Sequence, residues 1–455
     1  PYIGFGDDPI IGRLTCPPLT RYNHNTQKSE ALIVVPVMHS ELLWEYKLRQ
    51  GIYWWDESTL SSNDLLNFLK KNLARILVEK GFKDENLPIY ELASSPSSIK
   101  IKWRQAPKFG IYFLDGVSLT RELGHSNSSK LNYECVGNFF PKIDPLDKNQ
   151  NLLNLTPVKA YSYSRSNIKF YNHSYQHSKI LKKSLSFKFP GDDSTANIES
   201  LGKQKNCVKA FLPFASVLIW NLNHPLASQE IFRKLLSQLI PYEQIISQAA
   251  GGYGKYIRSV VSEDLYLQKT KQTPPPSYNV RFIKDQLLKN GFLQPETKSA
   301  AKGQRQLKVS IQNLPITSDL IEKVLADSFG AAGIHIKFDS LDSESHLARL
   351  QSLHLPDLST NILGFWRKIY PSLKPGNDRS FDHLLTIIAQ FNQSLSLGQA
   401  DLDLARKIIN KSSEMNLITP ILQHAACIES MGLSIPKNSA EYVNPDWFRN
   451  IVKGL

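Results

Sequence analysis

The chain of 455 residues has no apolar run that reaches the roughly 20 residues a membrane-spanning helix needs. Its longest apolar candidate, residues 31–38, has the length of a strand and is interrupted by Pro36. The sequence therefore predicts no membrane-spanning helix. Pro1 is followed by neither a basic start nor an apolar signal core, so we expect any export signal to have been removed or never to have been present.

Cysteine is scarce, with four residues in the whole chain: Cys16, Cys135, Cys207 and Cys427. None of them belongs to a Cys-x-x-Cys pair, which argues against a zinc site or a thioredoxin-type site. The even number is compatible with one or two disulfides in an exported protein, and equally with free buried thiols. The sequence alone leaves these alternatives open.

Motifs that carry catalysis are missing as well. There is no His-Glu-x-x-His, no Gly-x-Ser-x-Gly and no Gly-x-Gly-x-x-Gly after a strand. His173 and His177 lie in a polar stretch, where a chance pair is a better interpretation than a metal site. The glycine cluster 251–255 lacks the spacing of a phosphate-binding loop and predicts a turn. We therefore expect no enzyme activity, no cofactor and no metal.

The charge of the chain is strongly positive, with a formal net charge of +13 and a pI of about 9.3. Such a charge permits a nucleic-acid partner. However, lysines are spread along the whole length, most densely at 179–188 and 203–209, with no arginine-rich tract. The sequence therefore predicts a solvated basic surface and no nucleic-acid partner. The length predicts two or three domains.

The most informative stretch is 42–80. From 44 to 48, apolar and charged residues alternate, which predicts a strand with one buried face. Residues 56–58 supply turn chemistry, and polar residues from 61 onward offer helix caps. Apolar residues at three- and four-residue spacing then predict a helix that Gly81 ends.

Similar patterns predict shorter elements along the rest of the chain. The predicted strands are 88–92, 99–103, 110–114, 158–163, 168–171, 185–189, 217–221, 307–311, 334–338 and 418–428. The predicted helices are 230–240, 279–289, 318–330, 381–391 and 402–409.

The string from Tyr46 to Asp64 reads aromatic-x-Leu-Arg-x-Gly-Ile-x-Trp-x-Asp, followed by Leu-Ser-x-x-Asp. It resembles the signature segment of the family 5 extracellular solute-binding proteins. The family's usual Asp-Gly-Thr turn reads Asp56-Glu57-Ser58 in this chain. Further stretches resemble family segments in the same order along the chain, namely 217–255, 279–292, the strand–helix–strand unit 307–338 and the strand 418–428.

The resemblance implies an α/β fold: the two-lobed periplasmic-binding-protein fold of the class II type, with a ligand cleft between the lobes. We expect a first lobe of 1–30, 141–216 and 421–455, an inserted α/β subdomain of 31–140, and a second lobe of 217–420. The resemblance also implies a monomer that is periplasmic, or lipid-anchored outside the cytoplasm. Its expected partners are a peptide or other small-molecule ligand and the inner-membrane permease subunits of an ABC importer.

Family members carry a Gly-Trp-x-x-Asp-Tyr-x-x-Pro segment, whose aspartate pairs with the α-ammonium group of a peptide. In this chain Trp366 and Tyr370 match the segment, and Ile369 stands at the aspartate position. The resemblance implies ligand contacts from Trp366 and Tyr370 and puts recognition of a free peptide N-terminus in doubt. Arg367 and Lys368 would suit an anionic ligand if they face the cleft, and are as readily explained as solvated charges.

Three further residues are ligand-binding candidates. Trp220 and Asn221 end an apolar strand, where family members have an aromatic-Asn pair; for Trp220, a place in the core is the preferred interpretation. Asp8 would supply a carboxylate from the other lobe, although a turn cap is the plainer interpretation.

The resemblance implies a receptor that captures a peptide or peptide-like molecule by hinge closure. The alternative is a sensor that uses the same lobes in signalling or regulation rather than uptake. A hydrolase built on this fold is a third hypothesis, and the missing nucleophile and base motifs count against it.

Overall fold

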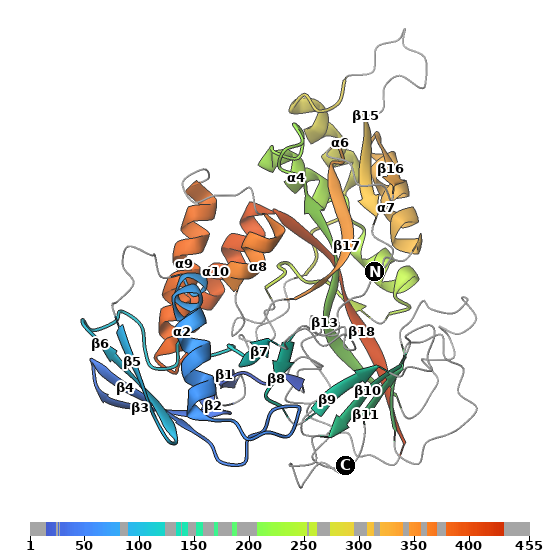
Figure 1. The fold of residues 1–455 in the computed structure, drawn as a ribbon. Coiled ribbons are helices and arrows are strands. Elements are labelled where there is room, and N and C mark those ends of the chain that lie inside the picture. The colour runs from blue at the N-terminus through green and yellow to red at the C-terminus, as the bar shows by residue number, and fades with distance from the viewer. Residues whose placement is uncertain are drawn as a thin grey trace. The chain divides into compact units, whose positions relative to one another are not determined.

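A computed structural model of the chain divides into two compact units (Figure 1). The first comprises residues 1–180, 356–408 and 444–455, and the second comprises 181–355 and 409–443. The structure describes residues 15–23, 26, 28–81, 90–122, 133–137, 139–143, 152–157, 168–171, 184–188, 207–252, 254–261, 274–294, 307–313, 319–339, 345–355, 362–370 and 379–431. Within these residues, no helix is both long enough and apolar enough to cross a membrane.

An antiparallel sheet of four strands lies in the first unit, in the order β3–β4–β6–β5. The strands are β3 (Val34–Ser40), β4 (Leu43–Leu48), β5 (Tyr90–Ser95) and β6 (Ser98–Trp103). In β4, Trp44 pairs with Ile101 and Tyr46 with Ile99, and all four side chains are buried. The alternation at 44–48 therefore marks a strand with a buried face, as predicted.

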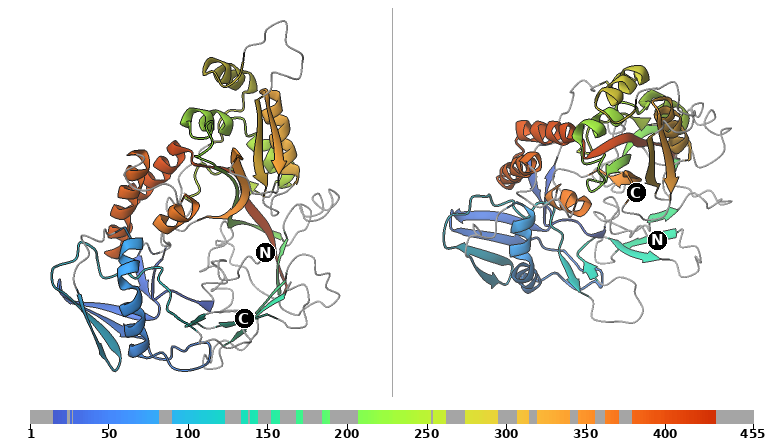
Figure 2. Two further views of the ribbon diagram at one scale, coloured as in Figure 1. Left: turned by 45° about the horizontal axis from the view of Figure 1, so that its top comes forward. Right: turned by 90° about the horizontal axis from the view of Figure 1, so that it is seen from above.

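Helix α2 (Ser62–Glu79) packs on this sheet against β5 and β6 (Figure 2). It begins with a capping box, in which Ser61 accepts the backbone N–H of Asp64 and the Asp64 carboxylate accepts the backbone N–H of Ser61. It ends before Gly81, which has a φ of +95°. A Cβ atom at Gly81 would lie 2.9 Å from the Cβ of Ala389, so both backbone conformation and close packing favour glycine there.

An aromatic cluster formed by Trp44, Trp103, Phe109 and Phe113 fills the space beside the sheet. Its ring centroids lie between 5.2 and 6.3 Å apart, and the contacts of Trp103 with the other three are edge-to-face. All four side chains are buried. This cluster is part of the main hydrophobic core of the first unit.

The predicted strand at 110–114 is wrong. The segment forms turns instead, in which the N–H of Phe113 donates to the carbonyl of Gly110 at 3.2 Å. The N–H of Tyr112 donates to the carbonyl of Ser396 at 2.8 Å rather than to a strand. The turns place Phe109 and Phe113 in the aromatic cluster. This packing, rather than a strand, explains the apolar residues of the segment.

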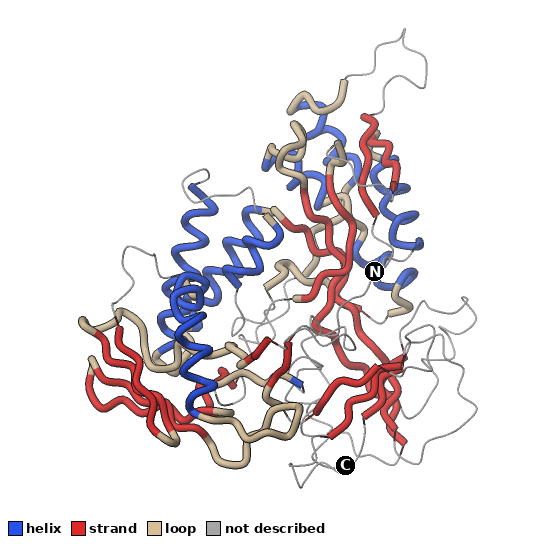
Figure 3. Tube along the Cα trace, viewed as in Figure 1, coloured by secondary structure: helices blue, strands red, loops and turns tan. Residues whose placement is uncertain are grey.

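The remaining described elements of the first unit are short strand pairs, a three-stranded sheet in the order β11–β10–β9, and helices (Figure 3). The strands are β1 (Thr20–Asn23) with β2 (Lys28–Ala31), β7 (Thr120–Glu122) with β8 (Tyr133–Cys135), and β9 (Phe139–Ile143), β10 (Leu152–Pro157) and β11 (Ile168–Tyr171). The helices are α8 (Ile362–Ile369), α9 (Arg379–Ser396) and the first half of α10 (Leu402–Met415). The predicted strand 158–163 lies outside the described residues.

The second unit is built on a larger mixed sheet in the order β12–β18–β13–β17–β15–β16, with β14 (Gly254–Lys255) added beside β18. The strands are β12 (Ser184–Lys188), β13 (Cys207–Trp220), β15 (Leu307–Asn313), β16 (Ile334–Asp339), β17 (Ala348–His354) and β18 (Ile418–Met431). Strands β13 and β18 pair over most of their length, so the predicted segment boundaries at 216/217 and 420/421 lie on neighbouring strands, both inside the second unit.

Helices accompany this sheet. They are α4 (Glu230–Ser237), α5 (Tyr242–Gln244), the π-helix η3 (Ile245–Ala249), α6 (Val280–Lys289) and α7 (Asp319–Ala331). Helix α7 connects β15 to β16, which are parallel neighbours, so the predicted strand–helix–strand unit at 307–338 is confirmed. Buried apolar residues from the helices and the sheet form one core cluster.

The two compact units have other bounds than the three predicted segments and do not test that division. Residues 356–408, which we assigned to the second lobe, belong to the first unit. The inserted subdomain 31–140 lies wholly within the first unit and is not separated from it. The three-part division therefore stays a prediction.

Candidate functional site

The aromatic pair predicted to contact ligand lies in the first unit, on and just after α8. Ile362, Trp366 and Tyr370 follow one another at four-residue spacing and so share one helix face. All three are buried, Trp366 with 1% of its surface exposed. The rings of Trp366 and Tyr370 are stacked, with centroids 6.4 Å apart and planes inclined by 17°. The four-residue spacing in the motif therefore places the two rings about one helical turn apart, where they stack.

The indole N–H of Trp366 is buried and has no hydrogen-bond partner among the described residues. Buried indole donors usually have a partner, and an unpaired buried donor carries a desolvation penalty of about 1–3 kcal/mol. Trp366 therefore carries a buried donor to which the described part of the chain supplies no acceptor.

The charged neighbours of this pair cannot be placed in the same way. Arg367 and Lys368 belong to α8, but their side chains lie outside the described part of the chain. Asp8 lies outside the described residues altogether. Ile369 ends α8 and is partly buried, where family members carry a carboxylate.

The second pair, Trp220 and Asn221, lies in the second unit at the end of β13. The Trp220 indole N–H donates to the hydroxyl of Thr419 at 2.8 Å, and the side chain is 1% exposed. Asn221 donates from Nδ2 to the carbonyl of His346 at 2.9 Å and accepts the N–H of Asn223 at 3.1 Å. Both side chains thus contact neighbouring strands and a turn, and Trp220 lies in the core as we preferred.

Arg233 on α4, in the same unit, is a buried arginine with a structural role. Its guanidinium donates to the carbonyls of Met415 and Asn416 at the end of α10, and to those of Ala227 and Ser228. The exposed fraction of Arg233 is 4%. Backbone carbonyls at a helix end favour a cation, so Arg233 holds α4, the preceding turn and the end of α10 together.

The turn in the signature segment shows how the sequence departs from the family pattern. Glu57 stands at the usual glycine position and has a φ of +71°. Asp56 Oδ1 accepts the N–H of Ser58 at 2.9 Å, which closes the turn. Arg121 pairs with Asp56 and Glu134 and lies over the ring next to this turn, 4.4 Å from the centroid of Trp54. The turn therefore forms with Glu57 in a left-handed backbone conformation that favours glycine.

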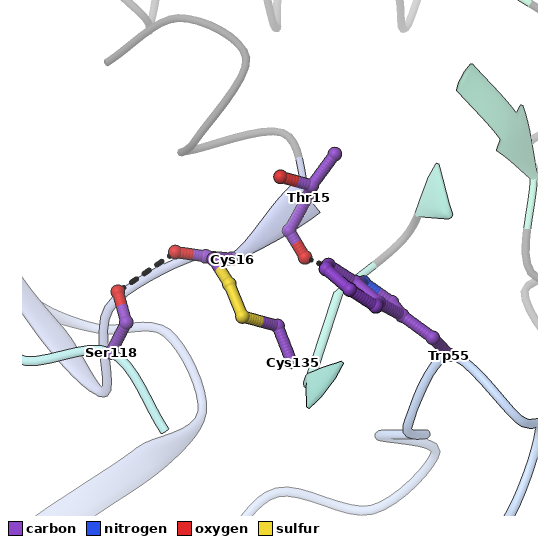
Figure 4. The surroundings of a disulfide bond; sticks show 5 residues. All are labelled: Thr15, Cys16, Trp55, Ser118 and Cys135. Atoms are coloured by element: carbon purple, nitrogen blue, oxygen red, sulfur yellow. Dashed lines mark hydrogen bonds between the residues drawn. A yellow bond between two sulfur atoms is a disulfide. The ribbon is translucent and has the colours of Figure 1, made fainter. Parts of the chain in front are cut away.

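A disulfide joins Cys16 to Cys135 beside the same segment, with Cα atoms 5.3 Å apart (Figure 4). Trp55 donates its indole N–H to the carbonyl of Thr15, and Ser118 donates its hydroxyl to the carbonyl of Cys16 at 2.8 Å. The sequence left this pairing open. The side chains of Cys207 and Cys427, on β13 and β18, lie outside the described part of the chain.

Two buried polar pairs gave no signal in the sequence. Lys80 donates from Nζ to the carbonyl of Asp115 at 2.6 Å, and burial raises the pKa of the Asp115 carboxyl to about 6. Ser216 and His424 approach within 2.9 Å between β13 and β18, and burial lowers the pKa of His424 to about 4. Ser216 is only 1% exposed, so it gives a substrate no access, and the pair does not support a hydrolase.

No protein-family model matches the sequence, and no curated protein matches it either. Solved structures do match along nearly its whole length. Structures of DppA from Helicobacter pylori, with the peptide STSA, align over 97% of this chain and 93% of theirs, at 14% identity and a TM-score of 0.67. The chain has the fold of the family 5 solute-binding proteins.

Two more solute-binding proteins show the same fold. NikA from Staphylococcus aureus, in complex with Ni(L-His)2, aligns over 96% of both chains at 16% identity and a TM-score of 0.63. AppA from Bacillus subtilis, in complex with a nonapeptide, aligns over 98% of this chain and 93% of its own at 13% identity, also with a TM-score of 0.63. The predicted α/β periplasmic-binding-protein fold is confirmed.

Proposed function

We propose that this protein is the solute-binding receptor of an ABC importer and captures a peptide or peptide-like small molecule by hinge closure. The observation that carries the proposal is the fold likeness, which extends over 93% or more of both chains in the three solute-binding proteins compared. Two of those structures hold a peptide and one a nickel–histidine complex. The chemistry is binding, without a covalent step, and no enzyme activity is expected.

The ligand contacts that we propose centre on Trp366 and Tyr370. Trp366 and Tyr370 are 1% and 5% exposed, so a ligand would reach the stacked rings only after local opening of this segment. The indole N–H, which has no hydrogen-bond partner among the described residues, would then donate to a ligand carbonyl or carboxylate. Because Ile369 replaces the family's aspartate, the ligand's N-terminus would not be held by a carboxylate at this position. Arg367, Lys368, Asp8, Trp220 and Asn221 remain candidates for further contacts.

The disulfide supports a site of action outside the cytoplasm. Disulfides persist in oxidising compartments such as the periplasm and are rare in the cytosol of most bacteria. The Cys16–Cys135 bond therefore favours the uptake receptor over the alternative, a regulator that senses the same ligand inside the cell. The partners that we propose are the permease subunits of the importer, and the receptor itself would act as a monomer.

The test is a binding measurement with defined probes. Trialanine, a mixture of dipeptides and nickel–histidine would each be titrated by calorimetry against the protein and against Trp366→Phe. This variant keeps a ring opposite Tyr370 and removes only the N–H donor, so we expect affinity for the bound probe to fall about threefold to tenfold.

Trp44→Phe is the matched control, because the indole N–H of Trp44 is also buried and without a partner among the described residues, but it lies in the aromatic cluster. We expect its affinity to equal that of the wild type. Equal affinities for all three proteins would overturn the proposed role of Trp366. Failure of a wide peptide and metal-chelate panel to bind the wild type would overturn the uptake receptor.

A further inference from the structure

The first unit contains a groove of its own, between the C-terminal half of α2 and the segment 116–120 that leads into β7. Its volume is about 290 Å³. Ligand sites in proteins usually span about 300–1,000 Å³, so this groove has room for one small molecule and not for an extended oligopeptide. All residues that line the groove belong to the first unit. The ligand proposed for it does not depend on the proposed receptor function.

The floor of the groove is apolar. Phe68 and Ile76, about two turns apart on the buried face of α2, expose 8% and 3% of their surface, and Val117 lines the groove from the other segment. An apolar side chain of a ligand would bury surface here at about 25 cal/mol per Å².

The walls carry both signs of charge. Arg75 donates to the Glu79 carboxylate at 2.6 Å, an exposed pair one helical turn apart. Lys80 donates from Nζ to the carbonyl of Asp115 at 2.6 Å, and Asp115 is 2% exposed. Burial lowers the pKa of Lys80, and the negative charge of Asp115 opposes this shift. Each cation thus has an anion beside it, and the groove has no large excess of either sign.

Hydroxyl groups complete the walls. Ser118 already donates its hydroxyl proton to the carbonyl of Cys16 at 2.8 Å, so its oxygen is left to accept a hydrogen bond from a ligand. Thr120, at the start of β7, is exposed and lines the groove with its hydroxyl-bearing side chain. The Ser118 oxygen therefore suits a cationic donor.

We propose that this groove binds a free α-amino acid with an apolar side chain, as its zwitterion. The ligand carboxylate lies against the Arg75 guanidinium, and the ammonium group lies against Glu79 and the Ser118 oxygen. A simple anion would be repelled by Glu79, and a simple cation by Arg75 and Lys80. An uncharged apolar molecule would gain from the apolar floor, but it would strip water from the ion pairs without replacing those hydrogen bonds.

The probe is L-leucine. Its binding to the full chain is measured by ligand-detected NMR and by equilibrium dialysis. L-Leucinamide lacks the carboxylate and N-acetyl-L-leucine lacks the ammonium group, so we expect each to bind about tenfold more weakly or not at all. Equal binding of all three compounds would overturn recognition of a zwitterion.

Two variants place the site. Arg75→Gln removes the guanidinium group that would bind the ligand carboxylate, and Thr120→Trp fills the groove. Both positions are exposed, so neither variant disturbs the core. We expect both to weaken leucine binding about tenfold or more. Arg406→Gln, which breaks a comparable exposed pair with Asp403 on α10, is the control and should bind as the wild type does.

Leucine that does not bind, or that binds all variants equally, would overturn the proposal. Trp366→Phe separates this site from the receptor site, because we expect it to weaken peptide binding and leave leucine binding unchanged. Loss of one activity with retention of the other therefore tells which of the two proposals has failed.

Discussion

The indole N–H of Trp55 donates to the carbonyl oxygen of Thr15 at 2.9 Å, one residue before the disulfide between Cys16 and Cys135 (Figure 4). The backbone N–H of Trp55 donates in turn to the carbonyl of Cys135 at 3.2 Å. The signature segment, the N-terminal segment and β8 are therefore fixed to one another by one covalent bond and two hydrogen bonds.

Removing the disulfide should lower the stability of the first unit. The bond closes a loop with a sequence separation of 119 residues, and such bonds typically contribute about 2–4 kcal/mol by restricting the unfolded chain. We expect the double variant Cys16→Ala/Cys135→Ala to lose about this much in chemical denaturation. A reducing agent should destabilise the wild type and leave the variant unchanged; a variant as stable as the wild type would contradict this role.

Replacing Glu57 by glycine should stabilise the signature turn. Glu57 has a φ of +71°, a conformation that disfavours residues with a Cβ atom by about 1–2 kcal/mol. The greater freedom of glycine in the unfolded chain offsets part of this gain, so we expect Glu57→Gly to raise the free energy of unfolding by about 0.5–1 kcal/mol.

The reverse change is available in the same segment. Gly51 has a φ of +70°, and a Cβ atom there would meet nothing within 4 Å. Gly51→Ala should therefore destabilise the protein by about 1 kcal/mol through backbone strain alone. A neutral Glu57→Gly together with a destabilising Gly51→Ala would contradict the backbone strain that we assign to Glu57.

The stability of the first unit should fall as the pH rises from about 4 to 6. Burial raises the pKa of Asp115 to about 6, above the value of about 3.9 expected in the unfolded chain. Between these values the folded state holds a proton that the unfolded state has released, so deprotonation favours unfolding, by about 3 kcal/mol in all.

Asp115→Asn should remove this slope, measured as the free energy of unfolding in urea at a series of pH values. Asp327→Asn, at an exposed position on α7, is the control and should keep the slope. A wild-type curve that rises with pH through this range, with Asp115→Asn unchanged from it, would contradict the assignment.

His424 should act in the opposite sense in the second unit. Burial lowers its pKa to about 4, so the folded state keeps it neutral while the unfolded chain takes up a proton below about pH 6.5. Acidification from about pH 6.5 to 4 therefore favours unfolding, by about 3 kcal/mol. We expect His424→Gln to reduce this acid loss, as followed by NMR titration of the histidine and by denaturation. A His424 that titrates near 6.5 would show that it is solvated.

The sequence predicted the elements whose signals are local. The helix cap at Ser61, the alternation around Trp44 and Tyr46 and the strand–helix–strand unit around α7 all depend on signals within a short stretch of sequence. It failed at 110–114, where aromatic residues resemble a strand but serve a cluster assembled from distant segments.

The candidate site could be predicted only in part, for a similar physical reason. The four-residue spacing of Trp366 and Tyr370 places them on one helix face, and the structure has them stacked. The hydrogen bond from Trp220 to Thr419 and the pair formed by Lys80 and Asp115 join residues far apart in the sequence. Such pairs depend on the whole fold, and no local pattern reports them.

Native mass spectrometry of the gently purified protein tests the central claim most directly, because a closed binding site often retains its ligand through purification. The receptor account predicts folded charge states that carry a bound peptide series or another small molecule, with the bare chain mass appearing on denaturation. A protein that shows only the bare mass, both as purified and after incubation with peptide and metal-chelate mixtures, would contradict ligand capture as its function.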